Sequence, residues 1–237
     1  MALSSDEQRI EEAAIVFAKS NRKTIAKRLT AIEDYPPEAE PVAVLMAGSP
    51  GAGKTEASIA LVARIGSPVL RIDPDELRGE FPGYTGDNAR LFQRAVSRVV
   101  DAILDRAFNQ RQSFLLDGTL ASYPSAHKNI ERALKDRRFV QILCVYQQPM
   151  QAWEFVRARE ASEGRRIDPA DFVDQYFAAR EVVNRLKSEF GKAIHVDLLL
   201  KNIDGSNRMY QAGIQNIDHH VPEQFTRRYV ENWVAIA

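Results

Sequence analysis

Short, unbroken apolar runs alternate along the chain with longer segments of helical periodicity. A run of four to eight apolar residues is typical of a strand that is covered on both faces of a parallel sheet. Among the longer segments, Asp87–Asn109 has the clearest helical pattern, because its apolar side chains recur every three or four positions. Strands that alternate with helices form right-handed βαβ units, so we expect an α/β fold, a doubly wound and mostly parallel five-stranded sheet with helices on both faces. The predicted strands are Val42–Ala47, Val69–Ile72, Ser113–Leu116, Phe139–Tyr146 and Ile194–Leu200.

The first part of the chain has a different pattern. Ser5–Gln8 has the spacing of a capping box, and helical periodicity continues from there to Ile32. Tyr35–Pro37 then breaks the helix, and a short linker follows. We therefore expect an N-terminal helix with its linker over residues 1–40 and the α/β domain over residues 41–237.

Composition and charge narrow the class of protein. Of the 237 residues, 45% are hydrophobic and 27% are charged, which is enough for one well-buried core. Lys plus Arg and Asp plus Glu both number 32, so nothing favours a nucleic-acid partner. The single cysteine, Cys144, lies inside an apolar run and suits a reducing compartment. With no apolar segment of membrane-spanning length and no signal-peptide pattern in Met1–Ile10, we expect a cytoplasmic protein without a membrane partner.

A glycine-rich segment between the first predicted strand and the next helix matches the pattern G-x-x-x-x-G-K-[ST]. Glycines let backbone amides wrap a phosphate, and the helix that starts there adds the positive end of its dipole. Lys54 is expected to reach the β- and γ-phosphates of ATP, and Thr55 to bind Mg²⁺. The predicted cofactors are therefore ATP and Mg²⁺. The expected cofactor-binding residues of this loop are Gly48, Ser49, Pro50, Gly51, Ala52, Gly53, Lys54 and Thr55.

Such loops also occur in GTPases and motor ATPases. This chain has neither the N-K-x-D motif that reads guanine nor the downstream apolar run with an acid that motor ATPases carry. An acid pair follows the second predicted strand instead. This combination favours a phosphotransferase, so residues 41–237 are predicted to form a P-loop kinase domain.

Asp73 and Asp75 lie where the second predicted strand ends, at the same edge of the sheet as the phosphate loop. A phosphoryl acceptor needs a carboxylate that orients its hydroxyl and takes up its proton. Asp75 is the candidate base, and Asp73 is its orienting neighbour or a partner of a Mg²⁺-bound water. The alternative is that the acids cap a short helix at Glu76–Glu80.

Asp117 ends the third predicted strand, and Thr119 follows it in the same turn. This carboxylate is expected to hold a Mg²⁺-bound water or a sugar hydroxyl, although a turn acid that bonds its own backbone has the same pattern. Asp101 lies on the polar face of a predicted helix, where its position alone indicates a solvated surface residue.

Four arginines surround Gly164, between two predicted helices. A basic loop over the phosphates would neutralise charge on the transferred group, and the planar fork of arginine suits phosphate oxygens. The alternative is an exposed helix end, where cations favour the C-terminal dipole. The four candidates are Arg157, Arg159, Arg165 and Arg166.

These motifs, taken in order, resemble the zeta-toxin family, kinases of bacterial toxin–antitoxin systems. The resemblance spans Val42–Leu200 and implies phosphorylation of the 3′-hydroxyl of the sugar in UDP-N-acetylglucosamine, which poisons cell-wall synthesis. The blocks that carry it are Gly48–Thr55, Ile72–Asp75 followed by Arg78 and Pro82, Leu116–Thr119, and the arginine loop before Asp168.

By position, the resemblance makes Asp75 the catalytic base and Arg166 an ATP-phosphate arginine, with Arg157 or Arg159 as the other. It also places Asp101, sixteen positions before Asp117, where the family has a substrate-binding glutamate. Asp75, Lys54 and Arg166 are therefore the expected catalytic residues. The expected substrate-binding residues are Asp73, Asp75, Arg78, Asp101, Asp117 and Thr119.

The resemblance also leaves alternatives. Shorter carboxylates at Asp101 and Asp117, where the family has glutamates, reshape the sugar pocket, so another metabolite, NAD or an antibiotic could be the acceptor. A catalytically inactive nucleotide-binding regulator is a third possibility. The family pairs with antitoxin proteins; the N-terminal helix could serve as an in-chain version that covers the ATP cleft, or it could pack on the sheet.

Overall fold

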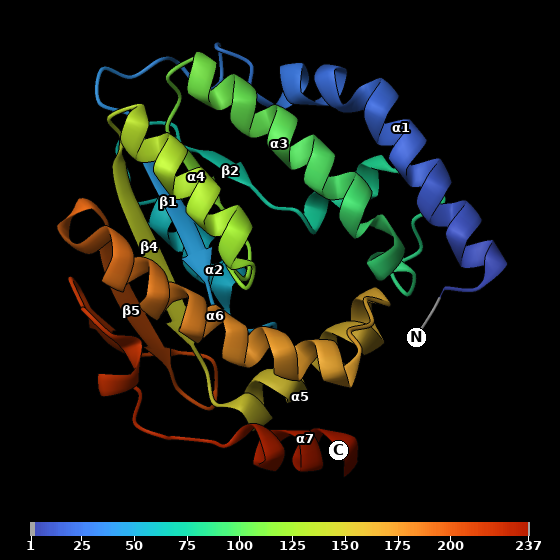
Figure 1. Cartoon of the computed structure of the whole chain (residues 1–237), viewed down its shortest axis with the longest axis vertical. Coiled ribbons are helices and arrows are strands. Elements are labelled where there is room, and N and C mark those ends of the chain that lie inside the picture. The colour runs from blue at the N-terminus through green and yellow to red at the C-terminus, as the bar shows by residue number, and fades with distance from the viewer. Residues whose placement is uncertain (1–2, 237) are drawn as a thin grey trace.

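The protein folds around one sheet of six strands in the order β2-β3-β1-β4-β5-β6 (Figure 1). The structure is a computed structural model and describes residues 3–236. β1 is central and lies parallel to β3 and β4, so the chain crosses over between neighbouring strands as expected for a doubly wound sheet. The strands are β1 (Val42–Ala47), β2 (Leu70–Ile72), β3 (Phe114–Leu116), β4 (Phe139–Tyr146), β5 (His195–Lys201) and β6 (Asn207–Gln211).

Helices connect the strands and cover both faces of the sheet. A short turn of 3-10 helix, η1 (Glu76–Glu80), follows β2, and a second, η2 (Ala89–Phe92), leads into α3. The helices are α1 (Ser5–Leu29), α2 (Lys54–Val62), α3 (Gln93–Asn109), α4 (Tyr123–Lys135), α5 (Pro149–Glu163), α6 (Pro169–Phe190) and α7 (Arg227–Ile236). Two further 3-10 turns are η3 (Gly191–Ala193) and η4 (Ile217–His219).

The central strand shows how alternate residues build two cores. Ala43 and Leu45 belong to the larger core, which is shared with α3, α4 and α6. Val44 and Met46 belong to a smaller core on the other face, beneath α2. Because successive strand residues point to opposite faces, the unbroken apolarity of β1 follows from its burial on both sides.

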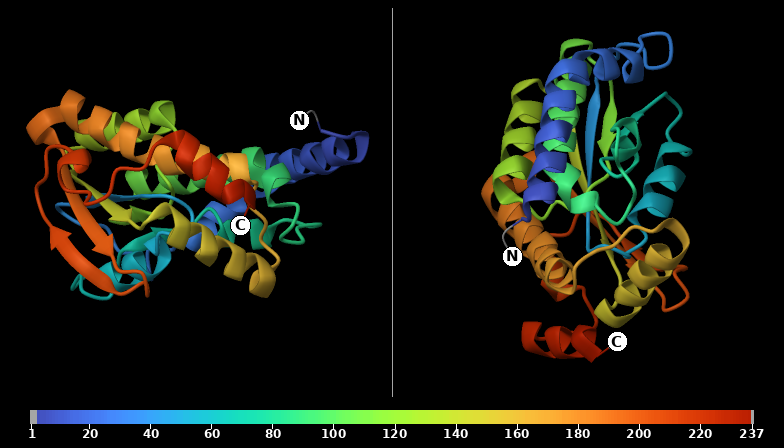
Figure 2. Two further views of the ribbon diagram at one scale, coloured as in Figure 1. Left: turned by 90° about the horizontal axis from the view of Figure 1, so that it is seen from below. Right: turned by 90° about the vertical axis from the view of Figure 1, so that its right-hand side faces the viewer.

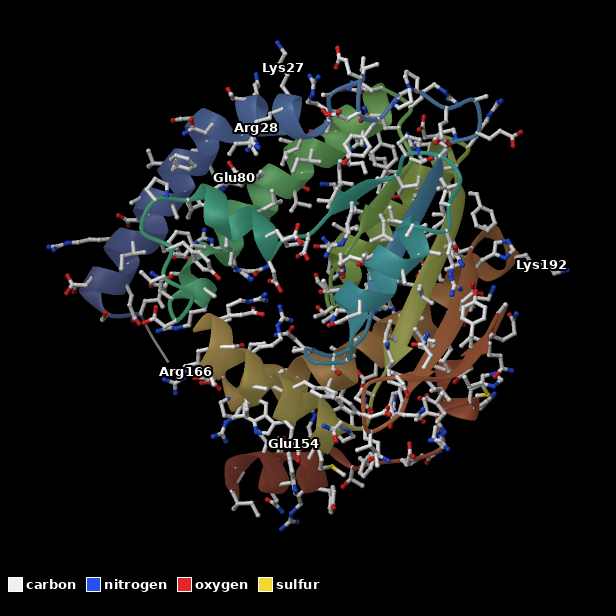
Figure 3. All side chains as sticks on the ribbon, turned by 180° about the vertical axis from the view of Figure 1, so that it is seen from behind. Lys27, Arg28, Glu80, Glu154, Arg166 and Lys192 are labelled. Carbon is white, nitrogen blue, oxygen red and sulfur yellow. The ribbon has the colours of Figure 1, made fainter. Side chains whose placement is uncertain are left out.

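α1 packs along α3 at the outer edge of the molecule (Figures 1 and 2). Its buried residues Ala14, Ala18 and Ile25 join the larger core. Ion pairs flank this contact: Glu7 with Arg90, and Arg28 with Glu80 at 2.7 Å (Figure 3). α1 therefore covers α3 and η2 and does not lie directly on the sheet. α7 lies at the other end of the molecule, against α5 and α6.

The structure corrects two expectations. The sheet has a sixth strand, because β6 returns antiparallel to β5 after a turn at Gly205, with Leu199 opposite Tyr210. The capping box uses Ser4 and Glu7, one residue earlier than expected, and α1 ends at Leu29. Within residues 3–236, no helix is long and apolar enough to cross a membrane.

Candidate active site

The phosphate-binding loop lies between β1 and α2 and has the backbone that its glycines allow. Gly48 and Gly51 have φ of 138° and 72°, and a Cβ on either would lie 2.3 Å or 2.0 Å from a backbone oxygen, of Val145 or Ala152 respectively. Only glycine fits so close an approach. The loop is therefore clamped between the end of β4 and the start of α5.

Lys54 opens α2 and folds back over the loop, where Nζ donates to the carbonyl oxygen of Ser49 at 2.7 Å. Burial lowers the pKa of Lys54, and the nearby carboxylates of Asp117 and Asp75 partly oppose that effect. Arg159 adds a repulsion that also lowers this pKa. The ammonium group of Lys54 thus lies within the electrostatic reach of both acids and of one arginine from the α5–α6 region.

Asp75 stands just after β2 between two arginines. Its Oδ1 accepts from Arg78 and its Oδ2 from Arg165, which reaches across from the α5–α6 connection. Burial alone would raise the pKa of Asp75, but the two guanidinium groups outweigh it and hold the pKa below its usual value. The candidate base is therefore ionised and engaged by the loop that covers the site.

Asp73 is buried, and its Oδ1 accepts from the backbone N–H of Asp75 at 2.8 Å. Burial raises the pKa of Asp73, and the charges of Asp75 and Asp117 add to the rise. This bond fixes the turn that presents Asp75, so Asp73 orients the candidate base through the backbone.

Asp117 is buried at the end of β3 and is held from two sides. Ser58 of α2 donates its hydroxyl to Oδ2 at 2.6 Å, and Arg71 of β2 donates to the same oxygen at 2.7 Å. Ile72 and Leu116 are register partners, so Asp73 and Asp117, the residues that follow them, are brought together. The three acids of the site therefore belong to one connected group.

Arg71 and Ser58 are site residues that the sequence analysis missed. Arg71 bonds Asp73, Asp117 and the exposed Glu76. One signal existed in the sequence: a charged residue interrupts a buried strand two positions before Asp73, hence on the same face. Ser58 lies one helical turn after Thr55 on the side of α2 that faces the sheet, which periodicity could also have indicated.

The four candidate arginines have different surroundings in the structure. Arg165 contacts Asp75, and Arg159 lies near Lys54 and 3.4 Å from Glu163. Arg166 is 67% exposed in its side chain, 4.0 Å from Glu160, and lies at the periphery of the α5–α6 turn (Figure 3). Arg157 is exposed on α5. The geometry therefore favours Arg165 over its neighbour Arg166 as the arginine of the catalytic group.

The remaining predicted site residues differ in whether they contact the group of acids formed by Asp73, Asp75 and Asp117. Arg78 contacts this group, since it bridges Asp75 and Gln93 of α3. Thr119 borders the phosphate loop, because its carbonyl oxygen accepts from the N–H of Gly48 at 3.2 Å. Asp101 is exposed on α3, two turns beyond Gln93. The structure does not bring Asp101 into contact with the acids.

The α5–α6 turn closes over this end of the sheet. A Cβ on Gly86 would lie 3.1 Å from the carbonyl oxygen of Gly164, so the turn touches the loop that follows η1. Arg165 comes directly after Gly164 and reaches Asp75. The covering segment and the candidate base are thus joined in this conformation.

The residues fit a nucleotide with Mg²⁺. Within residues 3–236, no group of three or more His, Cys, Asp or Glu side chains could hold a metal ion by itself. Mg²⁺ in phosphoryl-transfer sites keeps several waters and takes one or two protein oxygens besides the phosphates. The half-buried Thr55 at the start of α2 would supply one such oxygen, and the buried Asp73 and Asp117 would interact with waters of the ion.

Sheet order and phosphate loop together define a protein with the P-loop kinase fold. The sequence model of the family described as zeta toxin matches residues 25–215. The chain belongs to the zeta toxin family, which confirms the resemblance inferred from the motifs. The match begins inside α1 and includes every predicted site residue.

Solved structures share the fold. A chain of the PezAT chromosomal toxin-antitoxin system of Streptococcus pneumoniae has a TM-score of 0.62 at 15% identity, with 88% of this chain and 82% of that chain covered. A chain of the AvrRxo1-ORF1:-ORF2 structure with ATP has a TM-score of 0.57 at 16% identity, with 91% and 71% covered.

A curated relative matches a short segment only. ATPase family gene 2 protein homolog B of Mus musculus is 43% identical over 58 residues, which is 24% of this chain and 8% of that protein. The chain therefore spans less than a tenth of the length of this relative.

Proposed function

We propose that this protein is an ATP-dependent kinase that phosphorylates the 3′-hydroxyl of the sugar in UDP-N-acetylglucosamine or a closely similar nucleotide sugar. The observation that carries the proposal is the position of Asp75, an ionised carboxylate that lies after β2 and close enough to influence the pKa of Lys54 in the phosphate loop. Membership of the zeta toxin family supports the acceptor class.

In this proposal each residue has a separate task. The amides of the phosphate loop and Lys54 hold the β- and γ-phosphates of ATP, and Thr55 binds Mg²⁺. Bound Mg²⁺ neutralises charge on the phosphates. Asp75 accepts the proton of the attacking sugar hydroxyl.

Arg165 can leave Asp75 when the triphosphate offers it a stronger partner. An arginine fork on the transferred group would stabilise the charge that develops in the transition state. Its departure would also free one oxygen of Asp75 for the acceptor. The exchange couples nucleotide binding to release of the base.

The direct test is a transfer assay with ATP, Mg²⁺ and UDP-N-acetylglucosamine. The expected product is heavier by one phosphate, and Asp75→Asn should abolish its formation while nucleotide binding persists. Asp34→Asn is the matched control, because Asp34 is an exposed aspartate beyond the end of α1, outside the acid group. Wild-type protein that transfers phosphate to no nucleotide sugar would refute the acceptor assignment.

A second candidate is a kinase for a different small molecule, such as NAD or an antibiotic. The exposed position of Asp101 favours it, since the residue expected to bind the sugar makes no contact with the other acids. A mass-spectrometric screen of phosphorylated metabolites would separate the two candidates.

A toxin role with an antitoxin partner is part of the same proposal. The structural relatives come from a toxin-antitoxin system and from a two-protein complex, which supports a partner for this chain. Induced expression should impair growth, and Lys54→Ala should relieve the impairment. Unimpaired growth at a high level of active enzyme would count against a toxin.

A further inference from the structure

Arg71 is the centre of a charge network between β2, β3 and α2. Its Nε donates to Ser58 Oγ at 2.9 Å, and one terminal nitrogen donates to Asp117 Oδ2 at 2.7 Å and Asp73 Oδ2 at 2.5 Å. The other terminal nitrogen reaches Glu76 at 2.7 Å. The side chain is only 15% exposed, so this network is largely shielded from solvent.

The register between β2 and β3 brings two buried carboxylates close together, and Arg71 bonds both of them. Asp73 and Asp117 follow register partners on neighbouring strands, which lie about 4.8 Å apart in a sheet. Their side chains are 7% and 3% exposed. Two carboxylates so close and so buried repel each other, and a cation bonded to both relieves that repulsion.

The hydrogen bonds of Arg71 also determine which carboxylate oxygens of Asp73 and Asp117 remain open to other partners. In the part of the chain that the structure describes, every hydrogen bond to the Asp117 carboxylate ends on Oδ2, so Oδ1 is left for another partner. Asp73 gives Oδ2 to Arg71 and Oδ1 to the backbone N–H of Asp75. Arg71 thereby fixes Asp117 directly and the turn at Asp75 through Asp73.

We propose that Arg71 is a positioning residue that acts as the resident counter-cation of the Asp73–Asp117 pair. It holds both carboxylates in place before nucleotide arrives, and it keeps free Mg²⁺ from occupying the pair. Mg²⁺ would then be held by Thr55 together with the phosphates of the nucleotide. The inference deepens the proposed kinase function, on which its catalytic part rests.

The chemistry of guanidinium and of Mg²⁺ supports the assignment of the acid pair to Arg71 and of the nucleotide phosphates to Mg²⁺. A guanidinium group stays charged and presents several donors in a fixed plane, so one side chain can serve both acids and Ser58. Mg²⁺ gives up its waters reluctantly. It therefore does not displace a cation that is tethered to the strand and already bonded to both carboxylates.

The experiment compares wild type with Arg71→Met, Arg71→Lys and the control Arg64→Met, an exposed arginine beyond the end of α2. Melting temperature is measured without nucleotide, in millimolar MgCl₂ and in NaCl of equal ionic strength. Wild type and Arg64→Met should respond equally to both salts. Arg71→Met should melt at a lower temperature and recover part of the loss in MgCl₂ only.

Binding of Mn²⁺ without nucleotide, followed by electron paramagnetic resonance, gives a second readout that a purely structural arginine would not change. Arg71→Met should bind Mn²⁺, whereas wild type and Arg71→Lys should not. If Arg71→Met does not fold, Arg71→Gln takes its place. Equal Mn²⁺ binding by the wild type and the uncharged variant would overturn the proposal.

Kinetics separate this inference from the kinase proposal. Arg71→Lys keeps the charge and loses the fork, so kcat should fall about tenfold while KM for ATP changes less than about twofold. An unchanged kcat in this variant would contradict the positioning role. If the wild type transfers no phosphate, the kinase proposal fails, and the melting and Mn²⁺ experiments still decide the role of Arg71 as counter-cation.

Discussion

Arg165 and Asp75 form an ion pair between the α5–α6 connection and the residues that follow β2, 90 positions apart in sequence. The pair joins the candidate base to the segment expected to contact ATP phosphates. It places a cation of that segment directly on the carboxylate of Asp75. Under the proposed function, Arg165 would exchange Asp75 for a phosphate of the bound nucleotide.

Replacing Arg165 should affect both pH dependence and rate. Arg165→Gln removes one of the two cations that lower the pKa of Asp75, so that pKa should rise. The acid limb of kcat/KM against pH, which reports the free enzyme, should then move to higher pH. Loss of one donor to the transferred phosphate should also lower kcat by about 10²-fold.

Arg166→Gln is the matched control for this experiment, because Arg166 is the next residue and is largely exposed. It should leave the acid limb at its wild-type position and change kcat only slightly. The motif resemblance assigns the phosphate contact to Arg166. A larger loss of kcat from Arg166→Gln than from Arg165→Gln would favour that assignment over the one indicated by geometry.

Lys54→Met should weaken ATP binding without lowering the stability of the folded protein. Burial lowers the pKa of Lys54, which means that its charged form is disfavoured in the folded protein. At neutral pH, well below the unfolded pKa, an apolar side chain of similar length should keep or raise the free energy of unfolding by about 0.5–1 kcal/mol. The same change should weaken ATP binding more than about tenfold, because it removes the cation at the β- and γ-phosphates.

Lys192→Met provides the comparison, since Lys192 is exposed far from the phosphate loop (Figure 3). It should change neither ATP binding nor stability. Chemical denaturation and titration with a fluorescent nucleotide measure both quantities. A Lys54→Met protein that is markedly less stable than wild type would show that the ammonium group contributes net stability.

Gly51→Ala tests the clamp around the phosphate loop. A Cβ at this position would lie 2.0 Å from the carbonyl oxygen of Ala152, and the residue has a φ of 72°. The left-handed backbone costs about 1–2 kcal/mol for a non-glycine residue, and the collision adds to it. The variant should therefore lose at least about 2 kcal/mol of unfolding free energy, together with nucleotide binding.

Gly66→Ala is the control for Gly51→Ala. A Cβ on Gly66 meets nothing within 4 Å, and its φ is not positive. Its stability should equal or slightly exceed that of wild type, because alanine restricts the unfolded chain. Equal stability of the Gly51 and Gly66 variants would show that the loop adapts and that the close approach to α5 is not a constraint.

The parts of the site that could be predicted from sequence are those that depend on local geometry. The phosphate loop needs glycines, a lysine and a helix start in consecutive positions, and Asp73 and Asp75 follow a recognisable strand. The contacts that could not be predicted depend on tertiary structure. Arg71 meets Asp117, 46 residues away, because of the register between β2 and β3.

Dependence on tertiary structure also explains the other differences between the sequence-based expectations and the structure. Arg165 and Arg166 are adjacent in a loop without periodicity, so only the folded backbone decides which of them faces the acids. The sixth strand, Asn207–Gln211, is mostly exposed and carries polar residues, so it lacks the apolar pattern of a buried strand. It pairs with β5 because the turn at Gly205, with a φ of 81°, reverses the chain.

The role of α1 is tested by weakening its contact with the domain. Ile25 is 6% exposed within the larger core, and Val16 is 62% exposed on the same helix. Ile25→Ala should lower the free energy of unfolding by about 2–4 kcal/mol, whereas Val16→Ala should change it by less than about 0.5 kcal/mol.

Activity below the melting transition decides between a structural and an inhibitory helix. α1 packs on α3 and η2 rather than over the phosphate loop, so Ile25→Ala should leave kcat near the wild-type value. If α1 restrained the kinase in the manner of an antitoxin, loosening it would raise kcat or lower KM for ATP. A rise in either measure that Val16→Ala does not share would restore the in-chain inhibitor, and a loss of stability alone would assign α1 to the core.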